Sequence, residues 1–164
     1  IMTNSSLNSN SDSLIQKILS SSKTIAMVGV SSIKKDQDPK IIKRKPSIIV
    51  MKYLQEFGYK VIPVNPSVAG KQINGEIAVE KLNDIKIPVD IVNVFRPSKE
   101  TPPIAEETVK INAKVFWLQY GIKNEEAESI VSSKDIIYVS NRCIKQEYQR
   151  LFLKVNPVFP ALKK

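Results

Sequence analysis

The sequence predicts an α/β protein with a doubly wound, mostly parallel five-stranded sheet and helices on both faces. Two observations support this prediction. Short apolar runs alternate along the chain with amphipathic segments of helical spacing, and such alternation favours parallel strands joined by crossover helices. The run at 24–30 is an uninterrupted apolar stretch, which is typical of a strand buried on both of its faces.

Five apolar runs are the expected strands. They lie at 24–30, 60–64, 89–95, 114–118 and 136–139. The second strand closes at Pro63 and the turn Asn65-Pro66, because proline cannot donate a hydrogen bond within a ladder. A meandering stretch through Gly70 and Gly75 is expected to follow it.

The segments of helical spacing are the expected helices. They lie at 14–19, at 47–57, around Val79 and Leu82, and at 103–111, 125–131 and 142–152. Ser11 or Asp12 is available to cap the first of them, and Ser47 can cap the second. Gly58 is well placed to end the second helix in a left-handed conformation.

Length and composition fit one domain. The 164 residues are 42% hydrophobic and 25% charged, which is ordinary globular composition. The Ser- and Asn-rich residues 1–13 predict a disordered lead, 14–155 are expected to form a single domain, and 156–164 are expected to be a tail. No apolar run approaches the roughly 20 residues of a membrane helix, so no membrane partner is expected.

The chain contains no histidine and one cysteine, Cys143. Ser-His-Asp and Cys-His catalysis, phosphohistidine relays and histidine-based metal sites are therefore excluded within a single chain. A lone cysteine forms no intramolecular disulfide, and no secretory signal is visible, so a reducing, cytoplasmic setting is expected. We predict no catalysis by this chain alone and no metal site.

The net charge of +9 favours a polyanionic partner. Six bases lie between residues 34 and 45, against Asp36 and Asp38, directly after the first strand. This position favours a phosphorylated small molecule. The basic segment lacks interleaved aromatic residues for stacking bases, and no nucleic-acid-binding motif accompanies it, so nucleic acid is the third choice of partner.

The residues that follow the strands are the candidate site, because ligands of open parallel sheets bind at the carboxyl ends of the strands. The first strand leads into a turn of Gly29, Val30, Ser31 and Ser32, whose backbone N–H groups and hydroxyls could hold phosphate oxygens. The second strand ends in Asn65, where an acid would bind the ribose of NAD. This difference counts against NAD but not against an NADP-like role.

Short motifs occur in a specific order between about Lys23 and Phe152. They are Val28-Gly-Val-Ser31, Lys45-Pro-Ser47, Tyr53-Leu54 with Gly58-Tyr59, Pro63-Val-Asn-Pro66, Val89-Asp90 with Phe95-Arg96, Trp117-Leu-Gln119 with Gly121, Asn124-Glu-Glu-Ala127 and Arg142-Cys-Ile-Lys145. Together they resemble the small stand-alone coenzyme A binding proteins, which are related to the N-terminal domain of the succinyl-CoA synthetase alpha subunit. The resemblance implies a Rossmann-like fold that binds CoA along the strand ends.

The resemblance also implies roles for individual residues. The pyrophosphate would be held by Gly29, Val30, Ser31, Ser32 and Ser47, with Arg44 and Lys45 nearby, and the adenosine end would be flanked by Val64, Asn65, Pro66, Phe95, Arg96 and Pro97. Lys71 is a weaker candidate, and Gln119 could face the pantetheine arm. The departure from the family is the extended basic insertion at 33–44.

The favoured function is therefore binding of CoA or acyl-CoA as a carrier, sensor or partner module. Related CoA ligases use a phosphohistidine in further domains, and this chain has neither. The alternative is an NADP-type oxidoreductase, and the third candidate is a nucleic-acid-binding protein. An unidentified protein partner and an oligomer stay open.

Overall fold

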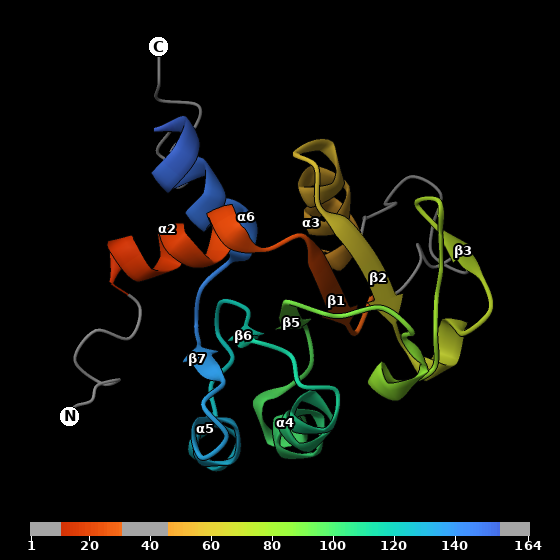
Figure 1. Ribbon diagram of the computed structural model, residues 1–164. Helices are drawn as coiled ribbons and strands as arrows, with labels where there is room; N and C mark the ends of the chain where they lie inside the picture. Colours follow the sequence, from red (N-terminus) through yellow and green to blue (C-terminus); the bar gives the residue numbers. More distant parts are fainter. Residues whose placement is uncertain (1–10, 31–45, 155–164) are drawn as a thin grey trace.

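A five-stranded parallel sheet is the centre of the molecule (Figure 1), for which a computed structural model describes residues 11–30 and 46–154. The strands are β1 (Thr24–Val28), β2 (Lys60–Val64), β5 (Ile91–Val94), β6 (Val115–Leu118) and β7 (Ile137–Val139). They lie in the order β2-β1-β5-β6-β7, and each neighbouring pair is parallel. The predicted Rossmann-like α/β class is confirmed.

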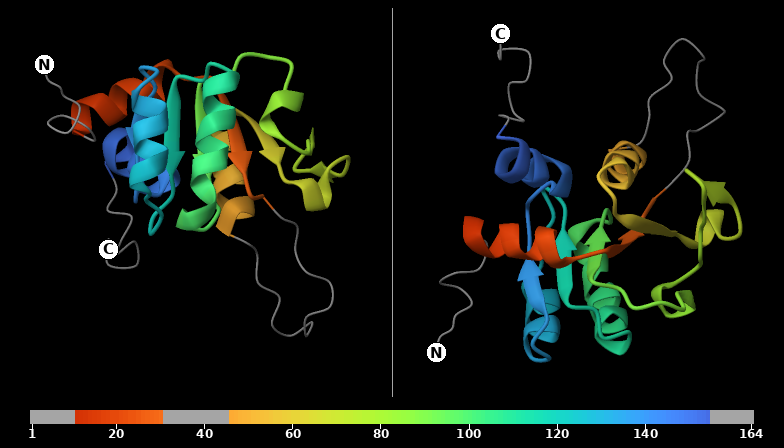
Figure 2. Two further views of the ribbon diagram at one scale, coloured as in Figure 1. Left: turned by 90° about the horizontal axis from the view of Figure 1, so that it is seen from below. Right: turned by 45° about the horizontal axis from the view of Figure 1, so that its top comes forward.

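Helices cover both faces of the sheet (Figures 1 and 2). One face carries α2 (Asp12–Ser21), α3 (Pro46–Glu56) and α6 (Ile144–Tyr148), and the other carries α4 (Thr101–Lys110) and α5 (Glu125–Ser132). Within β1, Ile25 and Met27 join the core on the first face, whereas Ala26 and Val28 join the core on the second. Successive side chains of a strand point to opposite faces, so this doubly covered strand has the apolar run that the sequence displays.

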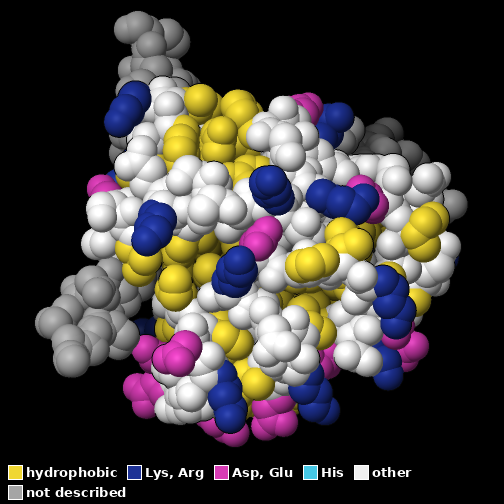
Figure 3. Space-filling view, viewed as in Figure 1, with side chains coloured by type: hydrophobic (Ala, Val, Ile, Leu, Met, Phe, Trp, Pro, Cys, Tyr) yellow, Lys and Arg dark blue, Asp and Glu magenta, His cyan; other side chains and the backbone are white. Residues whose placement is uncertain are grey.

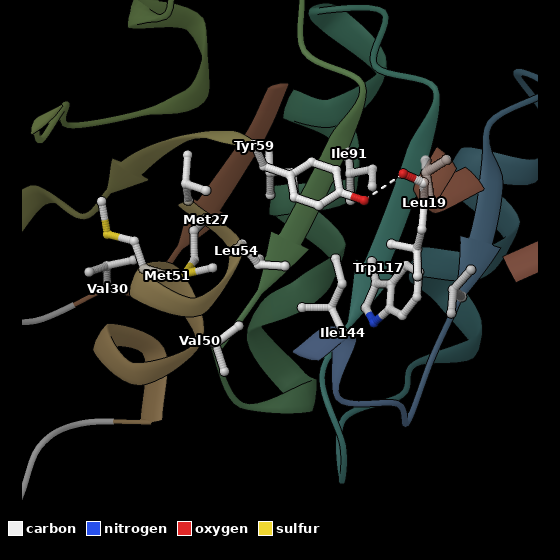
Figure 4. Close-up of a cluster of buried hydrophobic side chains, with 14 of the residues drawn as sticks. Leu19, Met27, Val30, Val50, Met51, Leu54, Tyr59, Ile91, Trp117 and Ile144 are labelled. Carbon is white, nitrogen blue, oxygen red and sulfur yellow. Dashed lines mark hydrogen bonds between the residues drawn. The ribbon is translucent and has the colours of Figure 1, made fainter. Parts of the chain in front are cut away.

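The larger core lies against α2, α3 and α6 (Figure 4). Its Trp117 is fully buried, and Trp117 Nε1 donates a hydrogen bond of 2.8 Å to the carbonyl of Arg142. The hydroxyl of Tyr59 donates to the carbonyl of Leu19 and so ties α2 to the start of β2. Burial raises the pKa of Tyr59 well above its ordinary value.

Two of the expected boundaries in the first half of the chain are wrong. The first strand ends at Val28 rather than at residue 30, because Gly29 has a φ of +100° and leaves the extended conformation. Ser47 does not cap α3, since that helix already includes Pro46 and Ser47 is buried within it. Ser11 does cap α2, and its side chain accepts a hydrogen bond of 3.2 Å from the N–H of Leu14.

The stretch after β2 is more regular than expected. Strands β3 (Gln72–Ile73) and β4 (Glu76–Ile77) form a small antiparallel hairpin. Its two turn residues, Asn74 and Gly75, have φ values of 48° and 85°, as a tight hairpin turn requires. The helix expected around Val79 and Leu82 is a single 3₁₀ turn, η3 (Leu82–Asp84), and Val79 instead forms a parallel bridge with Val64.

The C-terminal helical segment is confirmed, but it has two parts. The α-helix α6 is followed by a π-helical turn, η5 (Gln149–Leu153). Short 3₁₀ turns, η2 (Pro66–Val68) and η4 (Ser98–Glu100), follow β2 and β5. Within residues 11–30 and 46–154, no helix is long and apolar enough to cross a membrane.

Candidate functional site

A cleft of about 610 Å³ opens at the carboxyl ends of β1, β2 and β5. The strand order reverses its direction between β1 and β5, and open α/β sheets bind their ligands at such a reversal. The residues that line the cleft are Val28, Gly29, Val64, Asn65, Pro66, Ser67, Glu80, Lys81, Leu82, Arg96, Glu100, Ile104 and Glu107. Five candidates from the sequence therefore meet here: Gly29, Val64, Asn65, Pro66 and Arg96.

Gly29 joins the ends of three strands. Its backbone N–H donates a hydrogen bond of 2.8 Å to the carbonyl of Val64, and the N–H of Phe95 donates one of 2.8 Å to the carbonyl of Val28. A Cβ atom on Gly29 would lie 2.7 Å from the carbonyl oxygen of Phe95. The N–H of Gly29 therefore already has an acceptor within the protein. A backbone N–H of this turn that binds phosphate must belong to a residue after Gly29.

Asn65 holds the ends of β1 and β2 together. Its Nδ2 donates a hydrogen bond of 2.9 Å to the carbonyl of Val30, and its Oδ1 accepts hydrogen bonds of 3.0 Å from the N–H and the hydroxyl of Ser67. An ionised aspartate has no donor and would place an oxygen against the carbonyl of Val30. An NAD site would have an acid at this position. The hydrogen bonds of Asn65 explain why this chain has an amide instead.

Arg96 is the cation at the strand end of the cleft. Its Nε and Nη2 donate hydrogen bonds of 2.9 and 2.7 Å to Oε1 of Glu100, four residues further on. The side chains of the pair are 42% and 40% exposed, so solvent screens their attraction. Arg96 is held in one orientation at the rim and is still accessible to an anionic ligand.

Three carboxylates of the cleft were not among the sequence candidates. Glu80 precedes η3, and Glu100 and Glu107 belong to the segment of η4 and α4. Glu100, Ile104 and Glu107 are spaced four and three residues apart, so they share one face of the helix. This spacing was visible in the sequence, but a charged helix face is usually a solvated one.

Not all of the candidate residues line the cleft. Val30, Ser47, Lys71, Phe95, Pro97 and Gln119 do not line it. Ser31, Ser32, Arg44 and Lys45 lie outside the described residues. Lys71 is exposed beside the β3–β4 hairpin, and Phe95 packs against the larger core.

Gln119 is a buried link between three elements. Its Oε1 accepts hydrogen bonds of 3.0 Å from Nδ2 of Asn93 on β5 and of 3.0 Å from the N–H of Ile144 at the start of α6. The side chain is 6% exposed. Gln119 thus fixes the position of α6 relative to the ends of β5 and β6. No group of three or more His, Cys, Asp or Glu side chains in the described part of the chain could hold a metal ion.

Residues 23–149 match the protein family described as a CoA binding domain. The chain belongs to this family. The resemblance expected from the motifs is confirmed, and membership of this family supports CoA-related binding.

Three relatives are similar over most of their length. YneT of Bacillus subtilis, an uncharacterized protein, is 41% identical over 131 residues, which cover 80% of this chain and 89% of YneT. The structure of ID.343 from Thermus thermophilus has a TM-score of 0.76 and 38% identity, and the match covers 86% of this chain and 98% of that one. A hypothetical protein from Pyrococcus horikoshii also has a TM-score of 0.76, with 34% identity over 92% of this chain and 99% of its own.

Proposed function

We propose that the chain binds coenzyme A or an acyl-CoA at the cleft beside β1, β2 and β5. The observation that carries this proposal is that Gly29, Asn65, Pro66 and Arg96 meet in one cleft, in a chain of the CoA binding domain family. The volume of about 610 Å³ lies within the range of about 300–1,000 Å³ that is common for small-molecule sites.

In the proposed complex, Val64, Asn65 and Pro66 flank the adenosine end of CoA, and the side chain of Arg96 contacts a phosphate. Ser31, Ser32, Arg44 and Lys45 complete the phosphate site in this proposal. Ser47, Lys71, Val30, Phe95, Pro97 and Gln119 contribute indirectly, because they do not line the cleft. The last of these, Gln119, supports the adjacent start of α6.

The proposed role is that of a carrier, sensor or partner module in the cytoplasm. The related CoA ligases accept a phosphoryl group on a histidine in their further domains, whereas this chain has no histidine. A second protein would then use the bound CoA or respond to its binding.

Calorimetric titration tests the proposal. CoA, dephospho-CoA, NADP and a short oligonucleotide are each titrated into the purified chain. We expect CoA to bind, and dephospho-CoA to bind more weakly because it lacks the 3′-phosphate that basic side chains would contact. Binding of NADP without binding of CoA would support the NADP-type alternative and refute the proposal.

Replacing Arg96 tests the assigned phosphate contact. We expect Arg96→Ala to weaken CoA binding about tenfold or more, because a hydrogen bond to a charged group typically contributes about 1.5–3 kcal/mol. Lys99→Ala is the matched control, since Lys99 is an exposed cation on the same segment that does not line the cleft. An equal effect of the two substitutions would indicate general charge attraction and would contradict a contact by Arg96.

A further inference from the structure

Carboxylates line one side of the cleft. Among the residues that the structure describes, the lining includes the carboxylates of Glu80, Glu100 and Glu107 and two cations, Lys81 and Arg96. Glu100 is paired with Arg96, so within the described lining the carboxylates of Glu80 and Glu107 are left with one lysine, Lys81. On the molecular surface, acidic side chains also gather over α4 and α5 (Figure 3). An uncharged part of a ligand suits this side of the cleft better than a phosphate.

The two ends of the cleft differ in chemistry. Arg96 and Glu100 lie where β5 leads into α4, and Glu107 lies further along the same helix. With a rise of about 1.5 Å per residue, Glu107 is about 10 Å along the helix axis from Glu100. The apolar side chains of Leu82 and Ile104 belong to the same lining. A phosphate at Arg96 and a flat, largely apolar base near Glu107 would match this division.

Glu107 is held in place by the neighbouring turn. Its Oε1 accepts a hydrogen bond of 3.2 Å from the N–H of Leu82, and the side chain is half-buried. A carboxylate is an acceptor only and has about four acceptor positions, so this single bond leaves capacity for a donor in the cleft. Phosphate oxygens offer no donor, whereas the exocyclic amine of adenine offers two N–H groups.

We propose that Glu107 is a specificity-determining residue that accepts a hydrogen bond from the exocyclic amine of the adenine of CoA. The inference rests on the proposed function and names the base that the cleft selects. A base with a carbonyl at this position, such as hypoxanthine, would place an acceptor against the carboxylate.

The test compares the calorimetric affinities of CoA and of a CoA analogue in which adenine is deaminated to hypoxanthine. For the unmodified chain we expect the analogue to bind about tenfold or more weakly, as for loss of a hydrogen bond to a charged group. In Glu107→Gln, the side-chain oxygen can still accept from Leu82, and the amide NH₂ would face the carbonyl of hypoxanthine. The preference for CoA should therefore shrink to near unity or reverse.

Glu106→Gln is the matched control, because Glu106 is an exposed acid on α4 that does not line the cleft. It should keep the original preference. Equal affinity of the unmodified chain for the two ligands, or an unchanged preference in Glu107→Gln, would overturn the role of Glu107 while CoA binding stands. Failure of both ligands to bind the unmodified chain would instead refute the proposed function. If Glu107→Gln does not fold, Glu107→Asp replaces it, and its shorter carboxylate should lose the preference.

Discussion

At the scale of single residues, Gly29 illustrates how a sequence signal for phosphate binding can have a packing cause. A glycine directly after the first strand is typical of phosphate-binding turns. In the structure, Gly29 has a φ of +100°, and the carbonyl oxygen of Phe95 occupies the space where a Cβ would be. Its N–H is bonded to Val64. The close approach of β1 to the end of β5 therefore requires a glycine whether or not a ligand is bound.

We expect Gly29→Ala to destabilise the protein by about 3 kcal/mol or more, because it adds a backbone clash to an unfavourable φ. Gly70→Ala is the control, since Gly70 has a φ of +87° but a Cβ atom added there would meet no atom within 4 Å. It should cost only about 1–2 kcal/mol, for the left-handed conformation alone. Urea unfolding measures both values, and equal losses would contradict the steric role of Phe95.

At the scale of secondary-structure elements, buried polar side chains decide how the strand ends meet the helices. Gln119 connects β5, β6 and α6 through hydrogen bonds to Asn93 and Ile144. Trp117 adds a hydrogen bond to the carbonyl of Arg142, just before α6. A buried donor without an acceptor costs more than its hydrogen bond contributes, so these contacts specify one position for α6.

We expect Gln119→Leu to lower the free energy of unfolding by about 2–4 kcal/mol, since it leaves the N–H of Ile144 and Nδ2 of Asn93 without this acceptor. In the background of Asn93→Leu, the same substitution should lower the free energy of unfolding by less, because only the N–H of Ile144 then loses its acceptor. A double-mutant cycle by urea unfolding measures this coupling, which should exceed about 0.5 kcal/mol. Additive losses would show that the hydrogen bond from Asn93 to Gln119 contributes little.

At the scale of the whole molecule, ion pairs connect the first described helix to the last helical segment. Arg150 donates hydrogen bonds to Asp12 at 3.0 and 2.8 Å, across 138 residues of sequence. Arg150 also pairs with Glu147, which in turn pairs with Arg142. Helix α2 is thereby held against α6 and η5, on the face of the sheet opposite to α4 and α5.

This connection predicts a pH dependence of stability. The hydrogen bond from Arg150 lowers the pKa of Asp12, so the charged carboxylate stabilises the folded state at and above the ordinary pKa of an aspartate. The contribution is lost as the pH falls through the lowered pKa. At neutral pH, Asp12→Asn should therefore have a slightly lower melting temperature than the unmodified protein, and the difference should close in acid and in high salt.

Thermal unfolding over a series of pH values, at low and high salt, measures this difference. Glu126→Gln is the control, because Glu126 is an exposed acid in the first turn of another helix, α5. A difference between Asp12→Asn and the unmodified protein that does not change with pH would contradict the role assigned to the ion pair with Arg150.

The sequence by itself determined the class of the fold and the segments that form it. Both faces of each strand are covered, so successive residues of the strand are apolar. Buried parallel strands can therefore be recognised in the sequence as apolar runs. The sequence also placed Gly29, Asn65 and Arg96 correctly at the carboxyl edge of the sheet, because they lie at the ends of these apolar runs. The hairpin at Asn74 and Gly75 was missed, although its turn residues are typical, because each strand has only two residues.

Only the tertiary structure decided which strand ends meet. The order β2-β1-β5 brings Gly29, Asn65 and Arg96 into one cleft, whereas Gln119, at the end of β6, is buried against α6. Glu107 lines the cleft because α4 packs against η3. The residues next to Glu107 in the sequence do not indicate this packing. The physical reason is that periodicity depends on a few neighbouring residues, whereas strand order and side-chain partners depend on contacts between residues far apart in the chain.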